Sequence, residues 1–243
     1  MAKSISGVSL AKPQLNGAFS EKLYPEKSRR ERPAAVLFDM DGVLIDSEGI
    51  ALQAVAHAAN VVGHPIPDTV AHQLIGRGRD GGSLVLVTAL GGTFPVVRFW
   101  DVWHADYRER VAAGVPLKPG ALGALQALSD AGIRAAVATS TETALARYKL
   151  EQAGLLAHIE VVVGRDAVTH AKPAPDLYLH AARELGVDPR QCWAFEDSLP
   201  GLTAAVAAGA RTHWVPDLVH IHSHELPSGV ETIDSLHAIC RWL

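Results

Sequence analysis

Short apolar runs alternate with helical patterns through the second half of the chain, and this alternation most constrains the fold. The runs expected to be strands are Ile133–Ala138, Ile159–Val163, Cys192–Phe195 and a last strand at Arg211–Val215. The helices expected around them are Pro119–Ala131, Glu142–Ala153, Pro173–Leu185 and Gly201–Ala208. Strands separated by helices of this length indicate a parallel sheet with right-handed connections. The sequence therefore predicts an α/β fold, a doubly wound parallel sheet.

A different pattern precedes this alternating part. Residues Ala34–Phe38 form an uncharged run that reads as a buried first strand, and no convincing strand follows between Glu48 and Gly114. Four helices are expected there, at Ile50–Val62, Asp68–Ile75, Ser83–Leu90 and Val96–Ala112. We predict a small helical cap domain over residues 48–114, a core domain over 33–47 and 115–243, and an N-terminal extension over 1–32.

Composition narrows the class of protein. The chain has 243 residues, is 48% hydrophobic and carries a net charge of only -4 with both signs mixed, so no basic footprint for nucleic acid is expected. No apolar run reaches the roughly 18 residues of a membrane helix, and residues 1–32 lack the apolar segment of a secretory signal. The two cysteines form no pattern. We predict a reduced cytoplasmic protein without a membrane partner, a monomer or weak dimer.

Polar side chains follow the ends of the expected strands. In an open parallel sheet, ligands bind beyond the carboxyl ends of the strands. In chain order the residues delivered there are Asp39, Asp41, Thr139, Ser140, Thr141, Lys172, Glu196, Asp197 and Ser198. The sequence thus predicts one site built from carboxylates, an ammonium group and hydroxyls.

This set of groups makes chemical sense as a phosphoryl-transfer site. Crowded carboxylates repel one another unless a hard divalent cation lies among them, and Mg²⁺ prefers oxygen ligands. Lys172 can neutralise phosphoryl oxygens, and the Thr139 hydroxyl can cradle them with the backbone N–H groups of Ser140 and Met40. One carboxylate can attack phosphorus, and a second, two residues on, can protonate the leaving oxygen and later deprotonate water.

Four short motifs carry a family resemblance. The DMDGV of Asp39–Val43, the threonine of AVATS, the lysine of AKPAPD and the acidic pair of FEDS resemble the motifs of the haloacid dehalogenase (HAD) superfamily, over residues 33–217. The helical insert resembles the alpha-helical cap of its phosphatase and beta-phosphoglucomutase subgroup. The resemblance implies a Rossmann-like core and a Mg²⁺-dependent phosphatase that acts on a small phosphate monoester, such as a sugar phosphate or phosphoglycolate.

The resemblance also implies a role for each motif residue. Asp39 would be nucleophile and metal ligand, and Asp41 the acid/base, with its backbone oxygen on the metal. Asp197 would bind the metal directly and Glu196 directly or through water. The remaining two residues, Thr139 and Lys172, would hold the phosphoryl group. The dehalogenases of the superfamily lack the second aspartate, so Asp41 argues against that chemistry.

Two other functions stay open. A sugar-phosphate mutase would share the phosphorylated aspartate, but the beta-phosphoglucomutases carry a histidine where this chain has Ala51. They also carry lysines near the positions of Trp103 and Ile75. The other alternative is a non-catalytic binding protein on the same fold. The sequence does not identify the phosphate ester.

Several residues outside the motifs are weaker candidates. In the glycine-rich stretch Leu74–Ser83, Arg77 or Arg79 is proposed to contact the non-reacting part of the substrate, against a plain solvated loop. Trp100 and Trp103 are interpreted as cap core, and Asp46 and Ser47 as a helix cap. Three alternating histidines, His220, His222 and His224, could bind a metal on a strand, although a polar loop is favoured.

Overall fold

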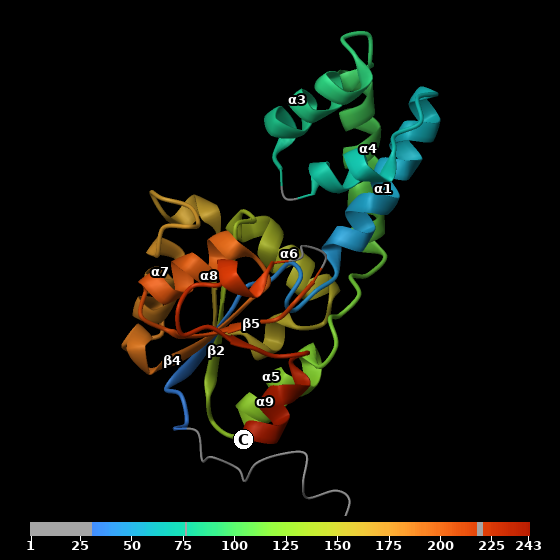
Figure 1. Cartoon of the computed structure of the whole chain (residues 1–243). Helices are drawn as coiled ribbons and strands as arrows, with labels where there is room; N and C mark the ends of the chain where they lie inside the picture. Colours follow the sequence, from blue (N-terminus) through green and yellow to red (C-terminus); the bar gives the residue numbers. More distant parts are fainter. Residues whose placement is uncertain (1–30, 76, 218–220) are drawn as a thin grey trace, which may run out of the picture. The chain divides into compact units, whose positions relative to one another are not determined.

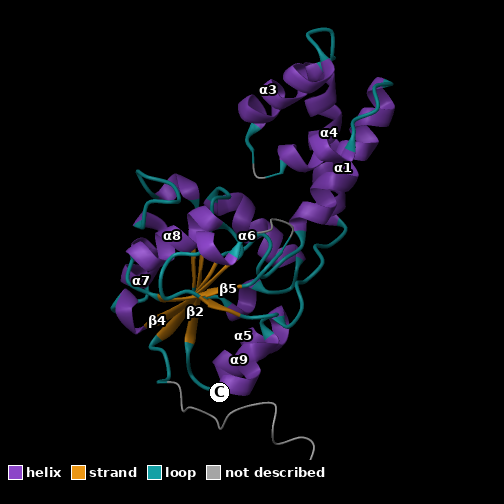
Figure 2. Cartoon of the chain, in the orientation of Figure 1, coloured by secondary structure: helices purple, strands orange, loops and turns teal. Residues whose placement is uncertain are grey.

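The central feature of the protein is a six-stranded parallel sheet (Figures 1 and 2). A computed structural model describes residues 31–75, 77–217 and 221–243. The strand order is β3-β2-β1-β4-β5-β6, and every neighbouring pair is parallel. The strands are Ala35–Phe38 (β1), Arg134–Ala138 (β2), Val161–Val163 (β3), Cys192–Glu196 (β4), Arg211–Trp214 (β5) and Glu231–Thr232 (β6). The predicted doubly wound α/β fold is confirmed.

Both faces of the sheet are covered by helices, because successive side chains of a strand point to opposite faces. Val36 and Phe38 of β1 belong to one buried cluster, and Ala35 and Leu37 belong to another. The first cluster includes residues of Ala121–Asp130 (α5), Thr143–Gln152 (α6) and His237–Trp242 (α9). The second includes residues of Asp176–Glu184 (α7) and Leu199–Ala207 (α8). The uncharged run at β1 is therefore buried on both sides.

The segment between β1 and α5 is helical, as predicted (Figure 1). Its α-helices are Ser47–Val62 (α1), Asp68–Ala71 (α2), Arg79–Leu90 (α3) and Val96–Ala112 (α4). They share a buried cluster of their own, which includes Val55, Leu86 and Phe99. The first helix begins at the predicted cap, where the Gly49 N–H donates to Asp46 Oδ1 at 3.0 Å. The predicted domain boundaries remain a proposal.

Several predicted elements differ from the structure, and the first helix of the insert begins at Ser47 rather than Ile50. Helix α7 begins at Asp176 rather than Pro173, and α3 begins at Arg79 rather than Ser83. Gly82 in this part of the insert serves packing, because a Cβ added there would lie 2.6 Å from the Trp100 ring. The strand at β5 is not the last, since β6 and α9 follow. With two and six residues, β6 and α9 are too short to leave a periodic pattern.

Across the described part of the chain, no helix combines the length and apolar character needed to cross a membrane.

Candidate active site

The sheet order brings the predicted motifs to one edge. Strand β1 lies between β2 and β4, with Phe38 in register with Val137 on one side and Phe195 on the other. The Asp39 N–H continues the ladder by donating to the Phe195 carbonyl at 2.9 Å. The residues that follow these three strands therefore emerge side by side at their carboxyl ends, which is where ligands bind in such sheets.

The turn after β1 depends on Gly42. This residue has φ +83°, a left-handed conformation that glycine adopts without steric cost. Its Cα also faces the side chain of Asp197, since a Cβ there would lie 2.3 Å from Asp197 Oδ2. The turn thus packs the first motif directly against the last one.

Asp39, Lys172, Glu196, Asp197 and Tyr178 form a buried set that we call the inner group. The Lys172 ammonium contacts Asp39 Oδ1 and lies 2.6 Å from Glu196 Oε1. The Tyr178 hydroxyl donates to the same Glu196 oxygen at 2.8 Å. Glu196 has no exposed surface. A loop lysine and a strand-end carboxylate, far apart in sequence, are thereby joined beside Asp39.

The second oxygen of Glu196 is engaged as well. It accepts from the backbone N–H groups of Asp197 at 3.0 Å and Ser198 at 3.2 Å, and from the Ser198 hydroxyl at 3.1 Å. Gly201 allows this approach, because a Cβ there would lie only 1.8 Å from Glu196 Oε1. The metal-ligand role predicted for Glu196 remains a proposal, and the geometry favours a carboxylate that positions Lys172.

The inner group carries more negative than positive charge. Burial raises the pKa of Asp39, opposed by the nearby Lys172 charge and reinforced by Glu196 and Asp41. Burial likewise raises the pKa of Asp197, with further contributions from Asp39 and Glu196. Burial lowers the pKa of Lys172, but the charges of Asp39 and Glu196 outweigh it and the pKa is raised. One ammonium therefore does not balance these carboxylates.

The donor chemistry of the inner group fits a hard divalent cation. Asp39 and Asp197 are buried oxygen donors whose charged forms are destabilised where they lie, which an added cation would relieve. Among the residues that the structure describes, no three His, Cys, Asp or Glu side chains form a ready-made metal cluster. The expected ligand set does not require one, because Asp41 would contribute its backbone oxygen.

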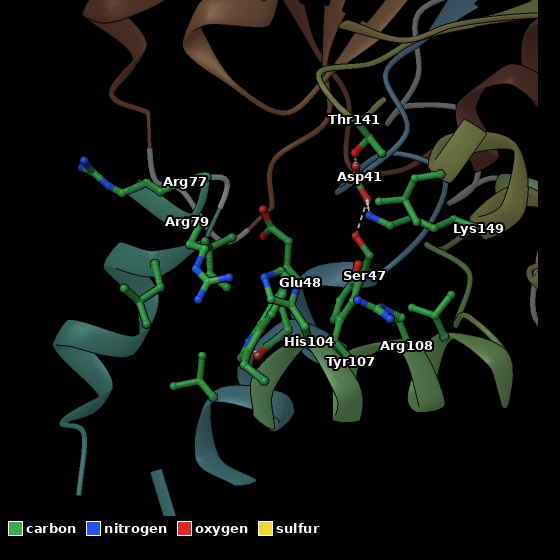
Figure 3. A pocket seen from close by; sticks show the side chains of 18 of the residues that line it. Asp41, Ser47, Glu48, Arg77, Arg79, His104, Tyr107, Arg108, Thr141 and Lys149 are labelled. Atoms are coloured by element: carbon green, nitrogen blue, oxygen red, sulfur yellow. Dashed lines mark hydrogen bonds and ion pairs between the residues drawn. The ribbon is translucent and has the colours of Figure 1, made fainter. Parts of the chain in front are cut away.

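Asp41 and the three residues that hold it, Ser47, Thr141 and Lys149, form a second set that we call the outer group. The Ser47 hydroxyl donates to Asp41 Oδ1, and Lys149 Nζ lies 3.0 Å from the same oxygen. The Thr141 hydroxyl donates to Asp41 Oδ2 at 2.8 Å (Figure 3). Burial raises the pKa of Asp41, but the Lys149 charge and these hydrogen bonds outweigh it, so the pKa is lowered.

A cavity of about 550 Å³ opens beside Asp41. Its walls come from α1, the segment around Arg77 and Arg79, α4, and α6 of the core. Among the motif residues predicted to be catalytic, Asp41 contributes to the lining, and so does Lys149 of the outer group. The other predicted residues of the motifs are absent from the lining: Asp39, Thr139, Ser140, Lys172, Glu196 and Asp197. Asp41, two residues after Asp39 in the chain, is therefore the predicted catalytic residue that reaches the cavity lining.

Aromatic rings form the cavity wall on α4. Trp103 lies parallel to Tyr107, with ring centroids 4.8 Å apart, and edge-on to Trp100 at 5.5 Å. Both indole N–H groups are used internally, by the Ala51 carbonyl at 3.2 Å and the Ser83 hydroxyl at 2.9 Å. Trp100 is buried in the insert, as interpreted, and Trp103 is half-buried. The two indoles thus present carbon surface to the cavity.

Three arginines also line the cavity. Arg79 lies 3.6 Å from Asp101, and its side chain approaches Glu48 and His104, whereas Arg77 extends away from the other labelled residues (Figure 3). Arg108 lies on α4 and was not predicted from the sequence as a site residue. Lys149 was not predicted either, and Ser47 was interpreted only as a helix cap. A helical lysine or serine gives no sequence signal of such a role, because the role depends on burial beside Asp41.

The histidine hypothesis has little structural support. His220 lies outside the described residues. His222 and His224 stack with centroids 5.5 Å apart, but they lie at a 3-10 turn over Ser223–Glu225 rather than on a strand. The premise that alternating residues share a strand face therefore does not hold for these two.

Comparisons with known proteins agree with this geometry. A family model described as haloacid dehalogenase-like hydrolase matches residues 33–209. The phosphorylated carbohydrates phosphatase of Thermotoga maritima is 32% identical over 175 residues, covering 72% of this chain and 81% of that protein. The chloroplastic Arabidopsis thaliana protein SUPPRESSOR OF QUENCHING 1 is 34% identical over 184 residues, which are 73% of this chain but 17% of that protein.

A solved structure extends the comparison to three dimensions. The crystal structure of a HAD family hydrolase from Deinococcus radiodurans, with bound phosphate and sodium, shares 32% identity and a TM-score of 0.72. The superposition covers 87% of this chain and 95% of that one. Because the family model matches residues 33–209, which is more than half of the chain, the chain belongs to the haloacid dehalogenase-like hydrolase family.

Proposed function

We propose that this protein is a phosphoric monoester hydrolase that cleaves a small sugar phosphate through an aspartyl-phosphate on Asp39. The observation that carries the proposal is that Asp41, two residues after Asp39, lines the cavity. With a phosphoryl group at Asp39, a leaving group in the cavity would then lie beside Asp41. This is the position that an acid/base for the leaving oxygen needs.

The proposed chemistry has two steps. The first step needs the protonated form of Asp41, so Asp41 must take up a proton when the substrate binds, because its pKa is lowered in the free protein. A carboxylate oxygen of Asp39 then attacks phosphorus and the ester P–O bond breaks, while the leaving oxygen takes the proton from Asp41 and departs as an alcohol. Asp41, now a carboxylate, then takes a proton from a water whose oxygen attacks phosphorus. The bond between phosphorus and Asp39 breaks and inorganic phosphate leaves. Lys172, held by Glu196, neutralises the phosphoryl oxygens in both steps, and Thr139 is proposed to bind them.

The proposed cofactor is Mg²⁺. The side chains of Asp39 and Asp197 and the backbone oxygen of Asp41 would hold it, with Glu196 direct or through water. When bound, the ion would supply the positive charge that the inner group lacks and that the phosphate ester needs. The excess of buried carboxylates over ammonium groups in the inner group supports this proposal.

The substrate class follows from the cavity and the relatives. A volume of about 550 Å³ suits a sugar phosphate better than a two-carbon ester. The carbon faces of Trp103 and its neighbours can pack on a sugar ring, and Arg79, Arg77 and Arg108 can hold hydroxyl or anionic groups. The named Thermotoga maritima relative is a phosphatase of phosphorylated carbohydrates, which supports the same class.

Phosphate release across a panel of esters tests the proposal. With Mg²⁺ present, hexose and pentose phosphates are expected to be hydrolysed faster than phosphoglycolate or nucleoside monophosphates, and a chelator should stop the reaction reversibly. No phosphate release from any ester would favour the binding-protein alternative. The proposed small phosphorylated partner, the monomeric or weakly dimeric state and the cytoplasmic location remain predictions.

One observation weighs against the mutase alternative. The Trp103 N–H donates to the Ala51 carbonyl at 3.2 Å, and both residues line the cavity. At these two positions, where the mutases carry a histidine and a lysine, this chain therefore has an alanine and a tryptophan joined by this hydrogen bond. Incubation with beta-glucose 1-phosphate should release free phosphate. Accumulation of glucose 6-phosphate would establish mutase activity instead.

A further inference from the structure

Lys149 is a buried lysine that the proposed chemistry does not yet use. It lies on α6 of the core, its side chain is 6% exposed, and its ammonium is 3.0 Å from Asp41 Oδ1. A buried ammonium is unfavourable unless it is paired, so a lysine at this depth needs a partner. The partner here is the carboxylate that the proposed function assigns to proton transfer.

Lys149 also contacts the helical insert. Its ammonium lies 5.6 Å from the ring centroid of Tyr107, a residue of α4 that packs in parallel on Trp103. A cation within about 6 Å of an aromatic centroid is attracted to the ring. Lys149 therefore joins three parts of the molecule: the core helix α6, the loop after β1 that carries Asp41, and the aromatic wall of the cavity.

The other donors do not replace Lys149. Asp41 Oδ2 accepts from Thr141 at 2.8 Å, and Asp41 Oδ1 accepts from Ser47 and from Lys149. Ser47 and Thr141 are neutral hydroxyls, whereas Lys149 brings the one positive charge in this set. A charged donor to a carboxylate makes a stronger bond than a neutral one. Lys149 therefore contributes the largest share of the attraction that fixes the Asp41 side chain at the cavity.

We propose that Lys149 is a positioning residue that holds the Asp41 carboxylate at the floor of the cavity, in line with the leaving-group oxygen of the substrate. This inference rests on the proposed function. Loss of Lys149 would leave Asp41 with hydroxyl partners only, so its carboxylate would swing over a wider range. Proton transfer to the leaving oxygen would then suffer, whereas attack by Asp39 would not.

The test compares two esters that differ in their need for that proton. The leaving group of an alkyl phosphate is a strongly basic alkoxide, which needs protonation. The leaving group of p-nitrophenyl phosphate is a stable phenolate, which does not. The ratio kcat/KM reports only the steps up to the first irreversible one. These steps include departure of the leaving group from phosphorus. Lys149→Met should lower kcat/KM for the best sugar phosphate by about 10–100-fold, but for p-nitrophenyl phosphate by less than about 3-fold.

Three variants make the result specific. Asp41→Asn should show the same selectivity between the two esters with a larger loss, and Lys149→Arg should recover part of the loss because it keeps the charge. The matched control is Arg147→Ala, which removes an exposed cation from the same helix outside the cavity lining and should change neither ester. If Lys149→Met does not fold, Lys149→Gln replaces it. The quantity to compare is the kcat/KM for the sugar phosphate divided by that for p-nitrophenyl phosphate, which does not depend on the fraction of active protein.

The outcomes separate this inference from the proposed function. An equal loss on both esters would assign Lys149 a merely structural role, and no loss on either would remove any role. Both results overturn the inference while the proposed function stands. A wild-type protein that hydrolyses neither ester would refute the proposed function itself.

Discussion

The inner and outer groups differ although they share one strand end. Asp39 and Asp41 are two residues apart, and each is paired with its own buried lysine, Lys172 or Lys149. In the inner group three carboxylates surround one ammonium, and the pKa of Asp39 is raised. In the outer group one carboxylate meets one ammonium and two hydroxyls, and the pKa of Asp41 is lowered.

This difference teaches how two identical side chains can take different tasks. The inner group is electrostatically incomplete, so it can accept a divalent cation and then a phosphoryl group. The outer group is balanced within the protein and lies at the cavity, so it can serve a leaving group without a metal of its own. Substitutions in the two groups and in the cavity wall test this division.

Replacing Asp39 with asparagine should abolish turnover. The amide cannot attack phosphorus usefully, and it also removes a charged partner of Lys172. Steady-state phosphate release with the best sugar phosphate measures the effect, and circular dichroism checks that the variant is folded. Substantial remaining activity would exclude the covalent route and with it the distinct task of the inner group.

Replacing Asp41 with asparagine should slow turnover by about 10²–10⁴-fold, because one acid/base residue typically contributes that much. Acid quenching within a single turnover should still detect some phosphorylated enzyme when p-nitrophenyl phosphate is the substrate. An unchanged turnover rate would remove the acid/base role, and the outer group would then be only structural.

Replacing Tyr178 with phenylalanine should have a moderate effect on stability. The change removes a buried donor to Glu196 Oε1, and the free energy of unfolding should fall by about 1–2 kcal/mol. Urea unfolding measures this value, and Tyr148→Phe on the exposed face of α6 is the control. Turnover should fall only several-fold. A complete loss of activity in a folded variant would mean that Tyr178 itself takes part in the chemistry.

Replacing cavity arginines should have the smallest effect and should appear in KM. Arg79→Ala is expected to raise KM several-fold with kcat nearly unchanged, and Arg77→Ala to raise it less, because its side chain extends away from the cavity residues around Asp41 (Figure 3). If the double variant leaves KM unchanged, the proposed contact between these arginines and the substrate is wrong.

The sequence predicted the parts of the fold that leave a periodic or compositional signal. The uncharged run before Asp39 and the alternation after Pro119 were enough for the sheet and the helical insert. The two-residue strand β6 and the short helix α9 were missed, since so few residues produce no period. The start of α3 was misplaced because the glycine-rich stretch was interpreted as a loop, although Gly82 packs against Trp100.

The same limit applies to the site. The motif residues were predictable because they follow strands that parallel pairing brings together. The engagement of both Glu196 oxygens and the pairing of Lys149 with Asp41 depend on burial and on contacts between distant segments. A lysine within a polar helix such as α6 has no sequence feature that separates a buried partner of a carboxylate from a solvated one.

The most direct measurement is a crystal structure of the protein with magnesium and beryllium fluoride, which mimics a phosphorylated carboxylate. The account predicts a trifluoroberyllate on Asp39, contacted by Lys172, with the metal bound by Asp197. It also predicts that Asp41 lines the cavity beside this adduct. An adduct on another residue, or a structure in which Asp39 and Asp197 bind no metal, would contradict the division between the two groups.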